Sequence, residues 1–323
     1  MASVNDLLRT AQAAAEAAGR YLRTVDRPAG PSAWVAKGRA DWATEVDRES
    51  ERIIGAILAR DTPGARIIGE ELTPAVRTDG LTWIVDPLDG TTNFLHGFPA
   101  FAVSIAAAVD GRLEAAAILH VPLNRLTTAT RGGGAWEAGH RLSVSTIEDP
   151  AHALIGTGFP FRDFERLGEY LGQFRRVVLG STGIRRPGSA AIDLADVAAG
   201  RFEGFWEQRL SAWDIAAGIL MVREAGGRVT DRGGRDLGVE HAEVIAGNPA
   251  IHRWLLGIMQ EDPPRPGASP LGRSSTPSRA APLPLAAARR RPSPGRWARR
   301  SPGCAAGSPC PAPHPTPGPA WTP

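Results

Sequence analysis

The sequence predicts an α+β fold in which helices cover mixed β-sheets. Three apolar or alternating segments, at residues 101–108, 113–120 and 125–130, follow one another with turn signals such as Asp110-Gly111 between them. This spacing is typical of an antiparallel meander. After residue 148 helical and strand patterns alternate. Such a mixture of elements is normally buried by packing helices on the faces of a sheet.

Capping and periodicity place further elements before the meander. Ser3, with Asp6 three residues later, indicates the N-cap of an alanine-rich helix. Isoleucine and leucine recur on one face of a second helical segment. The elements expected before residue 100 are helices at 3–25 and 47–58 and strands near 66–69 and 81–85.

The second half of the chain is expected to contain three strands and three helices. Before it, Gly132, Gly133 and Gly134 form a turn rather than a phosphate-binding loop, because no helix begins there and the P-loop pattern is incomplete. The predicted strands lie at 153–156, 177–179 and 204–207, and the predicted helices lie at 164–175, 190–199 and 215–225.

The segment from Trp83 to Phe94 carries the most chemical information. The three residues before Asp86 read as a buried strand, and Pro87 cannot continue a hydrogen-bonded ladder, so the backbone is expected to turn where Asp86 emerges. Asp89 can then reach the same side, and the Leu88 carbonyl offers a third oxygen. Hard oxygen donors of this kind suit Mg²⁺. The segment is therefore a candidate cation site.

The residues that follow favour an anion. Gly90 allows a backbone conformation with positive φ, and Thr91-Thr92 resemble the start of a helix, whose free amides attract phosphate. The same Asp-Pro-x-Asp-Gly pattern also makes an ordinary turn, with Thr91 or Thr92 as a helix N-cap. Taken alone, the motif leaves both interpretations open.

Two other segments contribute acids. A short apolar strand ends in Glu70 and Glu71, which taken alone is typical of a solvated strand end. Asp214 precedes a helical run, where taken alone it is an N-cap. If these acids meet Asp86 and Asp89 in one cleft, their repulsion requires compensation, which divalent cations supply.

In order and approximate spacing, these motifs resemble the signature of the inositol monophosphatase family, within the lithium-sensitive, Mg²⁺-dependent phosphatase superfamily. The resemblance covers residues 1–262 and includes the segments 41–47, 156–160, 185–191 and 224–227. It implies the layered αβαβα sandwich of the inositol monophosphatase and sugar phosphatase type. Two subdomains, at about 1–148 and 149–262, are expected to flank the active site.

The resemblance also implies roles for individual residues. Two or three Mg²⁺ ions would be held by Glu70, Asp86, the Leu88 carbonyl, Asp89 and Asp214. Glu70 and Thr91 would position the attacking water, and Asp47 would orient Thr91. The implied substrate-binding residues are Asp89, Gly90, Thr91, Thr92, Arg185, Gly188, Ser189, Ala190 and Glu207. Lys37, the only lysine of the chain, and Glu71 would support the site.

An inositol monophosphate is the first choice of substrate, because Glu207 can accept hydrogen bonds from two hydroxyls while Arg185 balances negative charge. Other small esters stay open as alternatives: histidinol phosphate, a fructose bisphosphate or a phosphoadenosine nucleotide. The chain departs from the family at Arg209, where relatives commonly carry glycine, and also at Pro187 and Ala212. These departures put the specificity in doubt rather than the metal binding.

The C-terminal segment from Pro263 to Pro323 differs from the rest of the chain. It contains 17 of the 28 prolines and nine arginines but no acidic residue, so its formal charge is +9. Because the whole chain has a formal net charge of +3, residues 1–262 carry −6. With few large apolar residues it is predicted to be a disordered tail. An RNA-binding or regulatory scaffold acting through these arginines is a second hypothesis. Out-of-frame translation is a third explanation of the tail.

The remaining expectations concern location and assembly. Both cysteines, Cys304 and Cys310, lie in the tail, which fits a reducing cytoplasm. Charged residues interrupt the first apolar positions, so no signal peptide is expected, and the apolar stretch 98–109 is too short to span a bilayer. The expected protein is cytoplasmic and does not bind membranes. By resemblance it is a homodimer.

Overall fold

A computed structural model describes residues 2–28, 30, 34–38, 41–71, 79–161, 164–239 and 242–261. The chain divides into two units, Met1–Ala268 and Ser269–Pro323, and every described residue belongs to the first. The predicted tail at 263–323 therefore lies outside the described residues. No helix in the described part is long and apolar enough to cross a membrane.

The larger of the two main sheets has seven strands in sequence order and contains the predicted meander. Only its first pair is parallel, and the other neighbours are antiparallel. Its strands are β3 (Arg66–Gly69), β4 (Leu81–Asp89), β5 (Ala102–Val109), β6 (Arg112–His120), β7 (Arg125–Thr130), β8 (Gly134–Glu137) and β9 (His140–Arg141).

The smaller sheet has five strands and mixes parallel and antiparallel pairs. Its spatial order is β11 (Gly183–Arg185), β10 (Leu154–Thr157), β12 (Gly204–Leu210), β14 (Ala242–Gly247) and β13 (Arg228–Thr230). The first three strands are parallel, and β14 is antiparallel to both of its neighbours. A separate hairpin pairs β1 (Val35–Gly38) with β2 (Asp41–Ala43).

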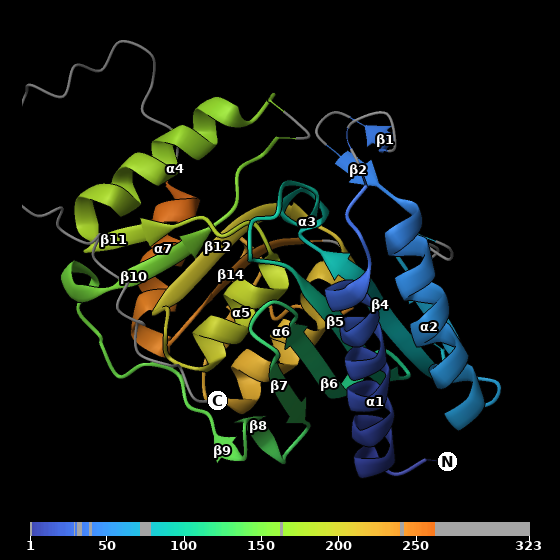
Figure 1. The fold of residues 1–323 in the computed structure, drawn as a ribbon. Helices are drawn as coiled ribbons and strands as arrows, with labels where there is room; N and C mark the ends of the chain where they lie inside the picture. The colour runs from blue at the N-terminus through green and yellow to red at the C-terminus, as the bar shows by residue number, and fades with distance from the viewer. Residues whose placement is uncertain are drawn as a thin grey trace, which may run out of the picture. The chain divides into compact units, whose positions relative to one another are not determined.

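Helices form three layers around the two sheets (Figure 1). Helices α1 (Val4–Thr24) and α2 (Glu45–Asp61) pack on the outer face of the large sheet. Helices α5 (Ala190–Ala198) and α6 (Ala212–Glu224) lie between the sheets, and α4 (Leu167–Gly180) and α7 (Pro249–Gln260) cover the other face of the small sheet. The predicted αβαβα sandwich is confirmed.

Three apolar cores correspond to these layers. Alternation along β4 directs Trp83 and Val85 toward α1 and α2 but Ile84 toward α5 and α6. The third core joins Trp206 of β12 to α4 and α7. The two faces of the large sheet are thus both buried, which explains why its central strands read as continuous apolar runs.

The first two helices begin at capping boxes that residue type explains. The strand predicted at 177–179, in contrast, is wrong. Ser3 and Asp6 form the capping box of α1, and Thr44 and Asp47 form that of α2. Residues 177–179 are not a strand: they continue α4, which begins at 167 rather than 164. Val177 is buried in the core beneath α4, so packing at helical spacing outweighs the strand preference of consecutive valines.

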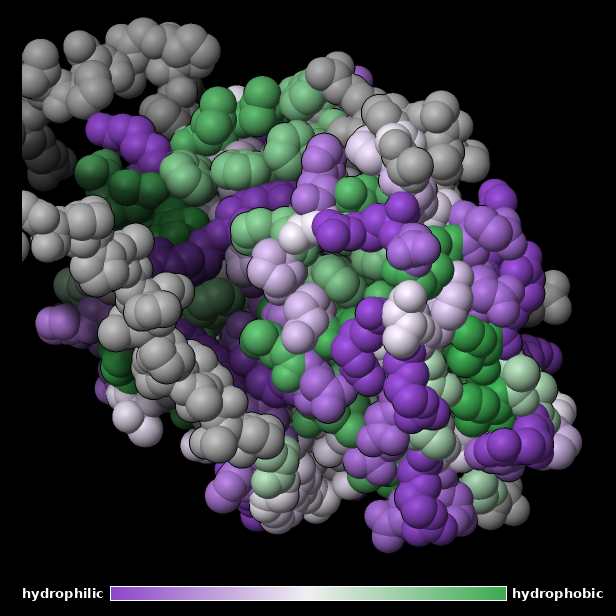
Figure 2. Space-filling model, in the orientation of Figure 1, coloured by the Kyte–Doolittle hydropathy of each residue, from purple (hydrophilic) through white to green (hydrophobic). Residues whose placement is uncertain are grey.

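The face shown in Figure 2 carries an apolar patch over α4. Leu171, Val178 and Leu179 of this helix are exposed. Large apolar side chains that cluster on a surface are typical of contact sites.

The two central helices pack closely because Gly218 of α6 faces α5. A Cβ atom at Gly218 would lie 2.4 Å from Leu194 Cβ. We therefore expect Gly218→Ala to destabilise the protein by up to about 2 kcal/mol, since a crowding cost of about 1–3 kcal/mol outweighs the roughly 1 kcal/mol gained in helix propensity. Urea unfolding measures the difference.

Gly257→Ala in α7 is the matched control, because no atom lies within 4 Å of a Cβ there. It should stabilise the protein by up to about 1 kcal/mol. Equal stabilisation by the two substitutions would show that α5 and α6 are not in close contact at Gly218.

Candidate active site

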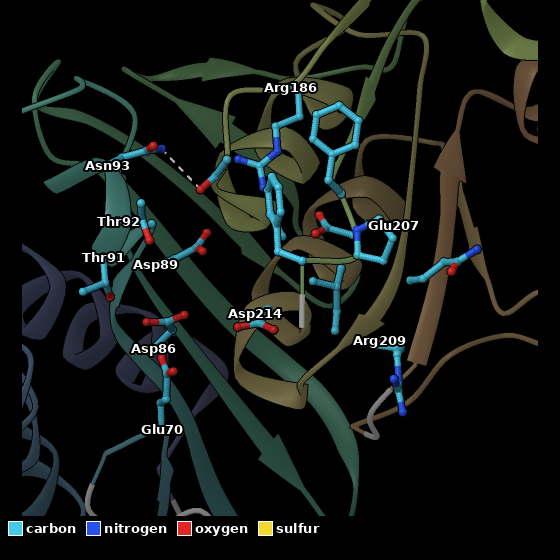
Figure 3. A pocket seen from close by; sticks show the side chains of 18 of the residues that line it. Glu70, Asp86, Asp89, Thr91, Thr92, Asn93, Arg186, Glu207, Arg209 and Asp214 are labelled. Atoms are coloured by element: carbon cyan, nitrogen blue, oxygen red, sulfur yellow. Dashed lines mark hydrogen bonds between the residues drawn. The ribbon is translucent and has the colours of Figure 1, made fainter. Parts of the chain in front are cut away.

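A cavity of about 350 Å³ opens where the ends of β3 and β4 approach α5, α6 and β12 (Figure 3). It is lined by Glu70, Asp86, Leu88, Asp89, Gly90, Thr91, Thr92, Asn93, Phe159, Pro160, Phe161, Arg186, Gly188, Ala190, Glu207, Gln208, Arg209, Leu210 and Asp214. Eleven of these nineteen residues were predicted from the sequence, so the motifs converge as expected.

A bulge in β4 brings two of the carboxylates to the same side. The strand does not end at Val85 as predicted but continues to Asp89, with Asp86 opposite Ser104 and Asp89 opposite Ala102. One extra residue on β4 thus opposes β5. In a regular strand Asp86 and Asp89 would point to opposite faces, whereas the extra residue turns both toward the cavity. Pro87 fits here because a bulge leaves its missing N–H without consequence.

Gly90 makes the sharp turn from β4 into the short helix α3 (Thr91–His96). Its φ is 89°, and a Cβ atom there would lie 2.9 Å from the Ala100 carbonyl oxygen and 3.3 Å from that of Gly188. Glycine is therefore required by both conformation and space. Gly90 itself is the N-cap, so neither Thr91 nor Thr92 has the capping role of the turn interpretation.

Four carboxylates, those of Glu70, Asp86, Asp89 and Asp214, share the cavity. Asp86 is 2% exposed. Burial raises the pKa of its carboxyl well above the usual value, and the negative charges of the other three raise it further. A divalent cation would relieve both effects, and all-oxygen donors are the set that Mg²⁺ prefers. The residues therefore fit such an ion.

The carboxylates are nevertheless spread over the cavity wall. No three of the described acidic, histidine or cysteine side chains stand close enough together to enclose one ion. Backbone contacts fix part of the arrangement: Asp86 Oδ1 accepts from Leu88 N at 3.0 Å, and Asp214 Oδ2 accepts from Ser211 N at 2.7 Å in the capping box of α6.

Thr91 is held by α2. Its Oγ1 lies 2.8 Å from Asp47 Oδ1 and 3.0 Å from the Leu88 carbonyl oxygen. Asp47 is 1% exposed, and its second oxygen accepts from Thr44 N at 2.8 Å. A hydroxyl has one proton and two lone pairs, so a Thr91 that donates to Asp47 keeps its oxygen able to accept a hydrogen bond.

The opposite wall comes from the smaller sheet and α5. Gly188, Ala190 and Glu207 line it, as predicted. Ser189 is buried behind the wall as the N-cap of α5, where its Oγ donates to Asp89 Oδ2 at 2.6 Å. Ala191 N lies 2.8 Å from the same oxygen.

Arg185, predicted to contact substrate, does not line the cavity, whereas Arg186 does. Arg185 is exposed, and its guanidinium donates to the carbonyl of Ile184. Successive side chains along an extended segment point to opposite faces, so one residue decides which arginine faces the cavity. The Arg185-Arg186 pair in the sequence indicated a cationic side chain at the site. The sequence did not show which of the two arginines faces the cavity.

Of the two predicted supporting residues, only Glu71 has a side chain within the described part of the structure. Glu71 does not line the cavity, and its backbone N–H donates to Glu51 Oε2 at 2.8 Å. Lys37 lies on β1, but its side chain is outside the described part of the structure.

Sequence reasoning missed several lining residues. Asn93 donates to the carbonyls of Ala100 and Pro187 at 2.6 and 2.8 Å and so connects α3 to the loop before α5. Phe159 and Phe161 flank Pro160 in a segment that the sequence marked only as part of a motif. The remaining missed residues are Arg186, Gln208, Arg209 and Leu210.

Arg209 occupies a position suited to glycine. Its φ is 60°, within the left-handed region, at a second bulge between Glu207 and Leu210. A left-handed conformation of this kind favours glycine over residues with a side chain. The chain therefore accepts backbone strain and gains a guanidinium at the cavity wall.

Comparison with known proteins yields one consistent family. A sequence model described as the inositol monophosphatase family matches residues 3–263. The inositol-1-monophosphatase of Rhizobium meliloti is 46% identical over 229 residues, which make up 71% of this chain and 86% of the relative. The Nus factor SuhB of Pseudomonas aeruginosa is 44% identical over 262 residues, or 80% of this chain and 95% of the relative.

Solved structures give the same result. The extragenic suppressor protein suhB from Bartonella henselae superposes with a TM-score of 0.72 at 41% identity, covering 79% of this chain and 98% of that protein. The inositol monophosphatase from Anabaena superposes with a TM-score of 0.70 at 32% identity, covering 80% and 96%.

The shared cavity predicts a stabilising response to Mg²⁺. At a hundredfold excess over the dissociation constant, binding to the folded state alone adds about 2.7 kcal/mol to the free energy of unfolding. The folded state raises the pKa of Asp86 well above its ordinary value of 3.8. The stability of the metal-free protein therefore falls as the pH rises from about 3.8 through this raised pKa. Thermal melts in chelator and in Mg²⁺ should therefore differ more at pH 8 than at pH 5.

Sodium chloride of equal ionic strength controls for screening, and Asp214→Asn should reduce the Mg²⁺ response. An unchanged melting temperature in Mg²⁺ would show that these acids only cap helices and turns.

Proposed function

The chain belongs to the inositol monophosphatase family, and from this premise we propose that it is a Mg²⁺-dependent phosphomonoester hydrolase acting on small polyol phosphates. An inositol monophosphate is the first choice of substrate. One observation carries the proposal: four carboxylates and the Thr91 hydroxyl, which come from β4, α3, α6 and the end of β3, line one cavity. Both a candidate cation site and a hydrogen-bond acceptor for water thus line the cavity.

The acidic wall would bind the ions. Glu70, Asp86, Asp89, Asp214 and the Leu88 carbonyl are the proposed ligands of two to three Mg²⁺ ions. When bound, such ions lower the pKa of a coordinated water and neutralise charge on the entering and leaving oxygens of phosphoryl transfer. A bound cation would favour the ionised form of Asp86 against the burial and the neighbouring carboxylates that raise its pKa.

Thr91 and Glu70 would prepare the water for attack. Thr91 donates to Asp47, so its oxygen can accept a hydrogen bond from water on the cavity side. Asp47 is buried and anchored by the α2 capping box, which holds the Thr91 rotamer in place. Glu70 would accept a second hydrogen bond from the same water. Thr91 is therefore a positioning group whose orientation depends on α2.

The start of α3 would bind the phosphoryl oxygens. The first amides of a helix have no partner within it, and their dipoles favour an anion. Gly90, Thr91 and Thr92 all line the cavity at this point. On the other wall, Glu207 and the backbone around Gly188 and Ala190 would bind the hydroxyls of the alcohol.

Other esters remain alternatives within this chemistry: histidinol phosphate, a fructose bisphosphate and a phosphoadenosine nucleotide. Relatives also include proteins named Nus factor SuhB. The RNA-binding hypothesis rests on tail arginines, which lie outside the described residues. A cytoplasmic location and a homodimeric assembly are proposed from the sequence alone. The exposed apolar side chains of α4 offer a surface through which two copies of the chain could associate.

A phosphate-release screen tests the function directly. We expect Mg²⁺-dependent release from inositol 1-phosphate and from a panel of sugar, histidinol and nucleotide phosphates, strongest for inositol 1-phosphate among esters whose only anionic group is one phosphate. Asp214→Asn should abolish nearly all of it. Full activity in chelator would contradict the proposal.

Thr91→Ala should lower kcat far more than it raises KM. The hydroxyl is assigned to orienting the attacking water, and misplacing a reacting group by about 1 Å can cost about 10²-fold in rate. Thr92→Ala is the matched control, because Thr92 lines the same cavity but lacks the hydrogen bond to Asp47. A change confined to KM in Thr91→Ala would remove the assigned role.

A further inference from the structure

Arg186 is an arginine braced by aromatic rings at the cavity wall. Its guanidinium carbon lies 5.5 Å from the ring centre of Phe159 and 5.0 Å from that of Phe161. The two rings meet edge to face, with centres 5.7 Å apart. In Figure 3 the side chain extends into the cavity near Glu207, across from Glu70 and Asp86. Cation–π contacts hold this guanidinium without using its N–H donors.

The surroundings of Arg186 leave those donors for a ligand. Arg186 is exposed at the rim of the cavity, and within the described residues it makes no hydrogen bond or ion pair, whereas the more buried Arg125 and Arg166 are paired with carboxylates. Gly188 makes room for it: a Cβ atom there would lie 2.6 Å from an Arg186 terminal nitrogen. The fold thus positions a cation at the cavity, held by two rings and without a hydrogen bond or ion pair to any described residue.

The position of Arg186 relative to the carboxylates indicates what it binds. If the acidic wall takes the reacting phosphate, the alcohol portion of the ester extends toward Glu207 and Arg186. A guanidinium stays charged, is weakly hydrated and matches the planar geometry of carboxylate or phosphate oxygens. Glu207 beside it suits a hydroxyl, because a carboxylate accepts hydrogen bonds and repels anions.

We propose that Arg186 is a specificity residue that binds a second anionic group on the substrate. This inference rests on the proposed function and deepens it: the enzyme prefers phosphomonoesters that carry a further phosphate or carboxylate over their uncharged counterparts. The second anion accepts hydrogen bonds from Arg186, while the first phosphate reacts at the acidic wall.

Two matched pairs of substrates test the proposal. Fructose 1-phosphate and fructose 1,6-bisphosphate differ by a phosphate, and glycerol 3-phosphate and 3-phosphoglycerate differ by a carboxylate. For the wild type, kcat/KM should be higher for the doubly anionic member of at least one pair, and the pair concerned identifies the anion. Arg186→Gln should lower that value about 10- to 100-fold, mainly through KM, as expected for a charge-assisted hydrogen bond.

Singly anionic esters are the internal control for folding, because Arg186→Gln should change their kinetics less than about threefold. Arg185→Gln removes the same charge one residue earlier, outside the cavity lining, and should keep the substrate preference. Phe161→Leu removes one bracing ring and should weaken the preference in the same direction as Arg186→Gln. Light scattering of each variant shows whether the assembly has changed.

Three results would overturn the inference alone: equal losses on both members of a pair, a selective loss in Arg185→Gln, or a wild type with no preference for either second anion. A protein that releases phosphate from none of the esters would overturn the proposed function as well. The two failures are therefore distinguishable.

Discussion

The contact between Asp89 and the N-terminus of α5 joins the two walls of the cavity. Asp89 ends β4 of the large sheet, and its Oδ2 accepts hydrogen bonds from Ser189 Oγ at 2.6 Å and from Ala191 N at 2.8 Å. A helix N-terminus favours negative charge, so this junction combines hydrogen bonding with the helix dipole. It sets the separation between the acidic wall and the wall that contains Glu207. The size of alcohol that the site accepts depends on this separation.

Local chemistry explains which features could be predicted from the sequence. The turn at Gly90, the capping residue Ser3 and the acids of the β4 segment each act over a few residues, and their positions follow from residue type. Longer-range effects were not predictable. The helix continues through Val177 because tertiary packing outweighs strand propensity, and Arg186 replaces Arg185 at the cavity because strand geometry decides which side chain faces inward.

The walls of the cavity differ in how strictly they are constrained. The acidic wall is fixed by backbone contacts and by the Thr91–Asp47 hydrogen bond. The other wall contains Arg209 in a left-handed conformation and Arg186 between two exposed rings. Relatives of one fold named both as inositol-1-monophosphatases and as Nus factors show that a fold does not by itself fix a function. Specificity is therefore to be sought on the second wall.

Pro87 has a consequence for how the strands align during folding. A β4–β5 ladder without the bulge would slip by one residue and turn Asp86 and Asp89 to opposite faces. In that alternative pairing Pro87 would occupy a regular ladder position, where it has no N–H to offer a partner carbonyl. The proline therefore disfavours the misaligned sheet as well as fitting the correct one. Pro87 thus helps to keep the carboxylates of Asp86 and Asp89 on the same side, although its own side chain takes no part in the chemistry.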